Sequence, residues 1–237
     1  MTTNESRFSF IAFIMSSKPI LYGTYSSPTV NGVLMILKAL NVDFEFREVR
    51  PLKKENQTED FLKKNPTATI PTLETEDHKF IGDSHAIAVY IAERYGKDDS
   101  LYPKDPYKRA KVHQLQHFCN SILFTSCVKA AYAPVFARQT NTIPEEIYKR
   151  IEEAFRMLER FLEQNRWVAC ERLTIADFNC ITSVASLYSL RPFTEKTHPR
   201  LYDWFQRMMA MPIVVETLSS DAMTASKRFL QKQLSHL

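Results

Sequence analysis

One junction in this sequence places hydroxyl groups where they could do chemistry. The stretch LYGTYSSPTVNG (residues 21–32) passes from an apolar, aromatic run into two serines and Pro28. Proline is favoured in the first turn of a helix, because its missing N–H would have no partner there. Ser27 is therefore expected at the N-cap, beside unpaired N–H groups and the positive end of the helix dipole. This arrangement predicts either an ordinary cap or a site that holds an anionic ligand.

Two further sites carry groups that suit a peptide-like ligand. Pro71 enters a strand-like run, where its missing N–H confines it to an edge or a bend. A cis Ile70–Pro71 bond would turn the chain sharply and leave the N–H and C=O of Ile70 available. Asp83 and Ser84 precede a helical run and predict a cap. Alternatively, Ser84 binds a carboxylate while Asp83 accepts an ammonium group, as a zwitterionic peptide end requires. His85 is expected as a half-buried structural histidine.

The elements that must position these residues fall into two groups. Residues 18–97 alternate strand-like and helical segments in the order βαβ-α-ββα. The strands are expected within 19–25, 42–49, 69–75 and 78–82. The helices are expected over 30–40, around 61–62 and over 84–95. A polar, proline-bearing linker follows over 98–105. Residues 106–237 carry only helical patterns, over 106–136, 144–164, 174–190, 199–210 and about 221–234. We therefore predict an α+β chain, with a small mixed-sheet domain followed by an all-α helical domain.

The stretch LTIADF (residues 173–178) is a structural signal within the helical half. Thr174 with Asp177 three residues later forms a variant of the capping box, with Leu173 and Phe178 at the positions of a hydrophobic staple. We expect this stretch to fix a helix in the core and to do no chemistry.

Composition excludes several classes of function. The 237 residues are 44% hydrophobic and 24% charged with a net charge of +4, and the basic residues are interleaved with acids, so we expect no nucleic-acid partner. The four glycines fit neither a dinucleotide fingerprint nor a P-loop. The four cysteines form no C-x-x-C pair and H-E-x-x-H is absent, so we expect no metal and a reducing, cytoplasmic location.

The first residues form a separate segment. The apolar run at residues 8–15 is too short to span a bilayer and lacks a signal-peptidase site. We expect residues 1–17 to be a disordered extension, with no membrane association.

Taken together and in this order, these motifs resemble a cytosolic glutathione transferase. The resemblance rests on Ser27-Pro28 after the first strand, NPTATIPTLE…DSHAI over 65–87, and LTIADF. It runs from about residue 18 to residue 212 and is nearest to the insect epsilon class, through YGKDDSLYPKDP, the pair His117-Phe118 and LTIADFNC. It implies a thioredoxin-like N-terminal domain, a homodimer, glutathione as co-substrate, and transfer to small hydrophobic electrophiles in detoxification.

The resemblance also assigns roles to individual residues. Ser27 matches the catalytic serine, whose hydroxyl would donate a hydrogen bond to the glutathione sulfur and favour the thiolate. The remaining glutathione contacts are expected from Ile70, Pro71, Asp83, Ser84, His85, Asn56 and Lys54. The hydrophobic substrate pocket is expected to contain Tyr25, Phe124, Cys127, Val128 and Ala131. Tyr22, within the strand, stands where other classes keep a catalytic tyrosine.

This sequence departs from the family pattern at the glycine end of glutathione. Ala68 and Asn56 occupy the positions where epsilon enzymes carry histidines, and Asn31 replaces the arginine that usually follows the Ser-Pro-Pro motif. These departures support an alternative function, a non-catalytic carrier of apolar ligands on the same fold.

Overall fold

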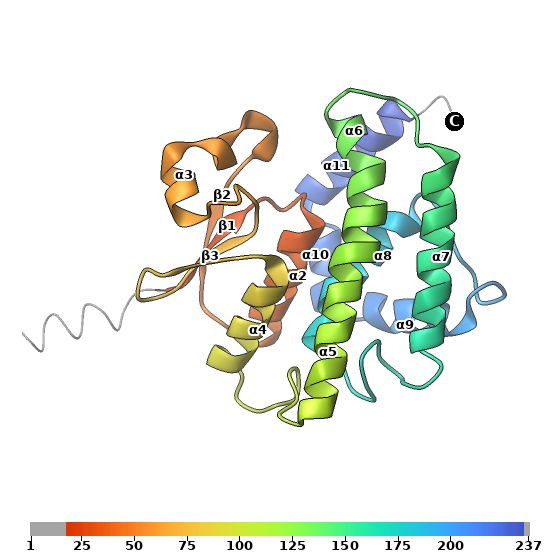
Figure 1. Cartoon of the computed structure of the whole chain (residues 1–237), viewed down its shortest axis with the longest axis horizontal. Helices are drawn as coiled ribbons and strands as arrows, with labels where there is room; N and C mark the ends of the chain where they lie inside the picture. Colours follow the sequence, from red (N-terminus) through yellow and green to blue (C-terminus); the bar gives the residue numbers. More distant parts are fainter. Residues whose placement is uncertain (1–17, 235–237) are drawn as a thin grey trace, which may run out of the picture.

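The structure is a computed structural model that describes residues 18–234. The extension predicted over residues 1–17 lies outside this range. Figure 1 shows a small sheet with its covering helices beside a larger group of long helices. The predicted α+β architecture, a thioredoxin-like domain followed by a helical domain, is confirmed.

The sheet has four strands in the order β2-β1-β3-β4, namely β1 (Ile20–Gly23), β2 (Glu45–Glu48), β3 (Thr72–Glu74) and β4 (Phe80–Gly82). β1 pairs in parallel with β2 and antiparallel with β3, and β3 pairs antiparallel with β4. Every residue of β1 is buried. This apolar strand can lie inside the sheet because it has a partner on each side, and its end delivers the chain to Ser27.

Three helices accompany the sheet: α2 (Pro28–Ala39), α3 (Glu59–Lys64) and α4 (Ser84–Tyr95). Two short 3-10 turns, η1 (Pro51–Lys53) and η2 (Glu55–Gln57), lead into α3. Val30, Val33, Leu34 and Leu37 recur at helical spacing and are all buried in α2. The helix starts predicted from Pro28 and Ser84 are confirmed.

The helical half contains α5 (Pro106–Phe118), η3 (Cys119–Lys129), α6 (Ala130–Phe136), α7 (Glu145–Phe161), α8 (Ile175–Tyr188), α9 (Pro199–Met209), α10 (Pro212–Leu218) and α11 (Asp221–Gln233). The helix predicted over 106–136 is continuous, and Figure 1 shows α5 and α6 in one column. Its middle section η3, however, is a π-helix. α10 was not predicted from the sequence.

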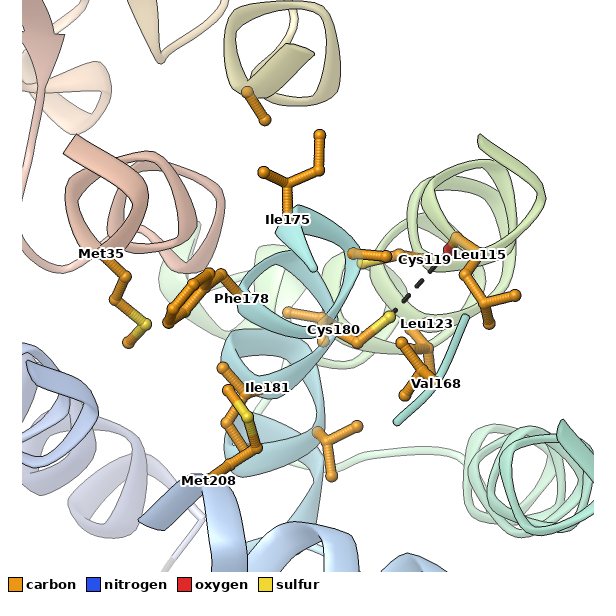
Figure 2. Close-up of a cluster of buried hydrophobic side chains, with 14 of the residues drawn as sticks. Met35, Leu115, Cys119, Leu123, Val168, Ile175, Phe178, Cys180, Ile181 and Met208 are labelled. Carbon is orange, nitrogen blue, oxygen red and sulfur yellow. Dashed lines mark hydrogen bonds between the residues drawn. The ribbon is translucent and has the colours of Figure 1, made fainter. Parts of the chain in front are cut away.

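Helix α8 lies at the centre of the helical half. Figure 2 shows Phe178, Cys180 and Ile181 of α8 among side chains from α2, from α5 and η3, and from α9. All three are fully buried. The interior is therefore shared by both halves of the chain, and the sheet domain packs on the helical domain through apolar side chains.

The predicted capping box fixes the start of α8. Asp177 is fully buried, and its Oδ2 accepts hydrogen bonds from Thr174 N at 2.8 Å and Thr174 Oγ1 at 3.2 Å. Its Oδ1 accepts from Val168 N and from Trp204 Nε1, each at 3.0 Å. One carboxylate thus holds α8, the preceding loop and α9 together, as the LTIADF motif predicts.

Gly32 allows α2 to approach α8 closely. A Cβ atom at this position would lie 3.2 Å from Asn179 Nδ2 and 3.3 Å from the Phe178 carbonyl oxygen. Because both distances are shorter than an ordinary contact, a side chain at this position would require Asn179 and the Phe178 carbonyl to give way. The absent side chain therefore sets how closely the two halves pack.

Candidate active site

The turn between β1 and α2 presents the Ser27 hydroxyl to a surface cleft. Ser27 is the N-cap of α2, with extended backbone angles, but its hydroxyl makes no capping hydrogen bond to that helix. Its backbone N–H donates to Thr24 O and its carbonyl accepts from Asn31 N, both at 3.0 Å. The backbone is thus held at both ends while the hydroxyl group lines the cleft.

Thr29 is the hydrogen-bond partner of that hydroxyl. Ser27 Oγ lies 3.0 Å from Thr29 Oγ1, and either oxygen can be the donor. Thr29 Oγ1 also lies 3.4 Å from the carbonyl oxygen of Ile70, to which it can donate. The three groups form a short chain of polar atoms along the cleft.

A loop before β3 forms one wall of the cleft. The Ile70–Pro71 peptide bond is cis, and both residues line the cleft. Asn65, which is almost fully buried, organises this loop by donating to Thr69 O at 3.0 Å and to Thr72 Oγ1 at 2.9 Å. Sequence reasoning used Asn65 only as the first residue of the NPTATIPTLE stretch and missed this role.

The start of α4 forms a second part of the cleft. Asp83 is the N-cap, with φ at 68°, and its Oδ1 accepts from His85 N at 2.9 Å and from Ala86 N at 3.1 Å. Ser84 is buried, and both Asp83 and Ser84 line the cleft. Both predicted roles of Asp83 are therefore compatible, because one oxygen caps the helix and the other stays available.

The cleft has a volume of about 600 Å³. It is lined by Thr24, Ser26, Ser27, Thr29, Pro51, Leu52, Asn56, Ala68, Thr69, Ile70, Pro71, Asp83, Ser84, Asn120, Phe124, Thr125, Lys129, Ala133, Phe136, Ala137 and Ser226. Asp83 and Lys129 are the charged residues of this set.

A second cavity of about 500 Å³ adjoins the cleft. Six residues line both spaces, namely Ser26, Phe124, Lys129, Ala133, Phe136 and Ser226. The remaining walls of the second cavity are Pro28, Val128, Tyr132, Tyr148, Ser186, Ser189, Leu190, Met223, Lys227, Leu230, Gln231 and Leu234. Burial raises the pKa of Tyr132 to about 12, so this phenol is neutral, and it donates to Ser186 O at 2.7 Å.

The structure brings part of the predicted hydrophobic pocket together. Phe124 and Val128 line the second cavity, whereas Cys127 and Ala131 are buried away from both spaces. The reason is the π-helical form of η3, in which residues five apart are bonded, so Phe124 shares a face with Lys129. Burial raises the pKa of the Cys127 thiol to about 11, which keeps it protonated.

Three other predicted contacts also lie outside the cleft lining. Tyr25 is 43% exposed, and its ring stacks on Phe46 with the centroids 4.2 Å apart. Lys54 ends η1 in a left-handed conformation, and its side chain does not reach the lining. His85 points inward from α4, where its ring packs in a small space beside the Cys119 thiol.

The resemblance predicts Asn56 at the glycine end of glutathione, and Asn56 lines the cleft. Its Nδ2 donates to Ala68 O at 2.6 Å, and both residues line the cleft. The two positions that carry histidine in the epsilon class, 56 and 68, are therefore joined here by a hydrogen bond. Asn56 Oδ1 is buried without a hydrogen-bond partner among residues 18–234.

Sequence reasoning missed the contribution of α11 to the second cavity. Met223, Ser226, Lys227 and Leu230 come from this helix. Their spacing of three and four residues indicates a common helical face. This spacing does not identify the helix against which the face packs. The sequence could therefore predict the helix α11 but not its contribution to the second cavity.

Family models match both halves of the chain. The N-terminal domain of glutathione S-transferase matches residues 21–99, and the C-terminal domain matches residues 123–212. The chain belongs to the glutathione S-transferase family. It is accordingly an enzyme of the transferase class, and glutathione is the substrate that the family uses. This favours the enzymatic interpretation of the sequence over the carrier.

Individual members of the glutathione S-transferase family are similar over most of their length. Glutathione S-transferase 1 of Manduca sexta is 35% identical over 195 residues, which cover 81% of this chain and 88% of that protein. An epsilon-class enzyme from the housefly, Musca domestica, is 41% identical with a TM-score of 0.83, over 92% of this chain and 98% of that one. A homologue from Drosophila mojavensis with bound glutathione is 36% identical with a TM-score of 0.83, over 92% and 97% of the chains.

Within residues 18–234, no group of three or more His, Cys, Asp or Glu side chains could hold a metal ion. None of the helices described there combines the length and the apolar character needed to cross a membrane.

Proposed function

We propose that this transferase activates glutathione through the Ser27 hydroxyl, which donates a hydrogen bond to the thiol sulfur and stabilises the thiolate. The observation that carries the proposal is the position of Ser27. Ser27 lines the cleft at the start of α2, and its hydroxyl makes no capping hydrogen bond to that helix. Both the hydroxyl and the positive end of the helix are therefore available to a negative sulfur.

The chemistry follows from the acidity of a thiol. A free thiol has a pKa of about 8.5, and the thiolate is the nucleophile. A hydrogen bond to the charged form lowers that pKa. A decrease of about two units corresponds to roughly 2.7 kcal/mol of thiolate stabilisation. The thiolate then attacks an electrophilic carbon held in the second cavity, forming a C–S bond as the leaving group departs with its electron pair.

Thr29 supports the orientation of the serine proton. The Thr29 hydroxyl has one proton, which it can donate to Ser27 Oγ at 3.0 Å or to Ile70 O at 3.4 Å. The shorter contact is the stronger hydrogen bond. When Thr29 donates to Ser27, the proton of Ser27 is free to point at the sulfur. Thr29 is thus a positioning residue in the proposed mechanism.

The peptide parts of glutathione have matching groups along the cleft. The backbone of Ile70, beside Pro71, offers a carbonyl and an N–H to the cysteinyl peptide unit. Asp83 and Ser84 hold the γ-glutamyl end, where Asp83 accepts from the ammonium group and Ser84 donates to the carboxylate. Asn56 stands at the glycine end. This assignment is supported by their shared presence in the lining.

The second cavity accommodates the electrophile. Phe124, Val128 and Tyr132 give it apolar walls, and its volume of about 500 Å³ is in the usual range of small-molecule sites. Because Phe124 also lines the glutathione cleft, a ligand in the cavity lies next to the sulfur. Small hydrophobic electrophiles, conjugated or dehydrohalogenated in detoxification, are the proposed substrates.

The test compares wild type with Ser27→Ala in the conjugation of 1-chloro-2,4-dinitrobenzene, with Ser26→Ala as the matched control. At pH 6.5, raising the thiolate pKa by about two units lowers the rate constant kcat/KM roughly fifty-fold. The absorbance of bound thiolate, titrated against pH, gives the pKa directly. Ser26→Ala keeps the wild-type pKa. Equal thiolate pKa values in wild type and Ser27→Ala would refute the mechanism.

The proposal includes a cytosolic homodimer. All four cysteines, at positions 119, 127, 170 and 180, are free, which suits a reducing compartment, and similarity to the family supports dimerisation. Sedimentation equilibrium tests it, and a mass equal to that of one chain at micromolar concentration would contradict the dimer.

A further inference from the structure

The second cavity has an unbalanced charge. Its lining contains two cations, Lys129 and Lys227, and no aspartate or glutamate. Both side chains are exposed at the rim, and neither forms an ion pair with another residue in 18–234. By contrast, two arginines of the neighbouring helix α7 pair with glutamates, Arg150 with Glu146 and Arg156 with Glu152. Two lysines without an ion-pair partner in residues 18–234 therefore line one space.

The rest of the cavity is apolar or neutral. Its other polar groups are hydroxyls and one amide, and the phenol of Tyr132 is already bonded to Ser186 O. A ligand that fills this space is therefore held by apolar contact over its body, while an anionic group on it finds a partner at the lysine rim. A hydrogen bond between a lysine ammonium and an anionic group is stronger than one between two neutral groups.

Lys129 stands at the junction of the two spaces. Lys129 lines the glutathione cleft as well as the second cavity. Lys227 comes from α11 and lines the second cavity. An anion held between them anchors a ligand at one edge while the apolar body reaches Phe124, which also borders both spaces.

We propose that this cavity selects electrophiles that carry a carboxylate on an apolar body, with Lys129 and Lys227 as the residues that recognise the anion. The inference rests on the proposed function, because the same thiolate attacks the bound molecule. With a chlorodinitrobenzoate, a C–S bond forms at the ring carbon, chloride leaves with the C–Cl electron pair, and the thiol proton goes to solvent.

The kinetic experiment uses two probes with the same ring. These are 4-chloro-3,5-dinitrobenzoate, which is anionic, and 4-chloro-3,5-dinitrobenzamide, which is neutral. They are compared in wild type, in the double variant Lys129→Gln/Lys227→Gln, and in Lys108→Gln, which removes the same charge from the exposed start of α5. The ratio between variants cancels the intrinsic reactivity of each probe.

We expect the double variant to lower kcat/KM for the benzoate about five- to ten-fold, an effect at or somewhat above the upper end for exposed ion pairs, and to change the benzamide less than two-fold. Lys108→Gln changes neither. Raising the salt concentration from 0.05 to 0.5 M weakens the preference of wild type because exposed charges are screened. An equal loss for both probes, or a rise only in the KM for glutathione, would overturn the proposal.

A binding measurement separates this inference from the serine mechanism. Calorimetry with 3,5-dinitrobenzoate and 3,5-dinitrobenzamide, which have no leaving group, reports the cavity without the reaction. We expect wild type and Ser27→Ala to prefer the benzoate equally and the lysine double variant to lose that preference. If Ser27→Ala retains full activity while the benzoate preference holds, the serine mechanism fails alone. If wild type shows no preference, the present inference fails alone.

Discussion

Replacing Thr29 by valine tests the hydroxyl chain of the active site. Valine has nearly the shape of threonine but cannot donate to Ser27 Oγ, which lies 3.0 Å from Thr29 Oγ1. The loss removes the donor that leaves the proton of Ser27 free for the sulfur. We therefore expect the pKa of bound glutathione to rise in Thr29→Val.

The size of the effect follows from the energy of the bond that Thr29 supports. If the serine contributes about 2.7 kcal/mol to the thiolate and a neighbouring hydrogen bond strengthens it by about 10–30%, the loss is about 0.3–0.8 kcal/mol. That corresponds to a pKa increase of about 0.2–0.6 and, well below the pKa, to a decrease in kcat/KM of about 1.5- to 4-fold.

The assay is an ultraviolet titration of the bound thiolate at saturating glutathione, with the pH profile of kcat/KM measured beside it. Thr29→Ser retains the hydroxyl and is expected to retain the wild-type pKa. A purely structural role of Thr29 predicts weaker glutathione binding at an unchanged pKa. A lower pKa in Thr29→Val would refute the reasoning, since it would mean that Thr29 takes the proton of Ser27 in the wild type.

Two further predictions concern groups outside the cleft. Tyr22 donates to Glu74 at 2.6 Å, and burial together with this bond raises the pKa of Tyr22 to about 12. Tyr22→Phe should therefore leave conjugation unchanged while lowering the urea midpoint. A loss of activity comparable to that of Ser27→Ala would contradict this prediction. Hydrogen bonds from Lys79 and Thr75 lower the pKa of Asp77 to about 2. A lowered pKa stabilises the fold at pH values above the ordinary pKa of 3.8, and this gain disappears as the pH falls toward 2. Asp77→Asn should therefore lower the urea midpoint at pH 7 but not at pH 2, and a pH-independent difference would show that the charge is not the cause.

Local signals in the sequence predict most of the fold. The spacing of Val30, Val33 and Leu37 identifies α2, and Pro28 and Ser84 locate two helix starts. These predictions succeed because capping and burial periodicity act within a few residues. The same signals predict which residues stand at the mouth of the cleft, since Ser27, Ile70 and Asp83 all lie at the ends of strands or helices.

The second cavity depends on information that local patterns do not contain. The π-helical η3 changes which side chains share a face, so Cys127 and Ala131 turn inward while Lys129 joins Phe124. Helix α11 is recognisable as a helix, but its packing beside α6 is a tertiary contact between distant segments. The short α10 begins at Pro212 and has only seven residues, too few for a periodicity to emerge.

The absence of a side chain at Gly32 lets α2, which begins beside Ser27, pack closely against the helical half of the molecule. Because α2 packs directly against Phe178 and Asn179 at Gly32, the position of its first turn depends on the position of α8. In the proposed mechanism, substitutions elsewhere in the helical half can change the shape of the second cavity without moving Ser27. A larger residue at position 32, in contrast, is expected to shift α2 against α8 and so to change the distance between Ser27 and the second cavity, although residue 32 lines neither the cleft nor that cavity.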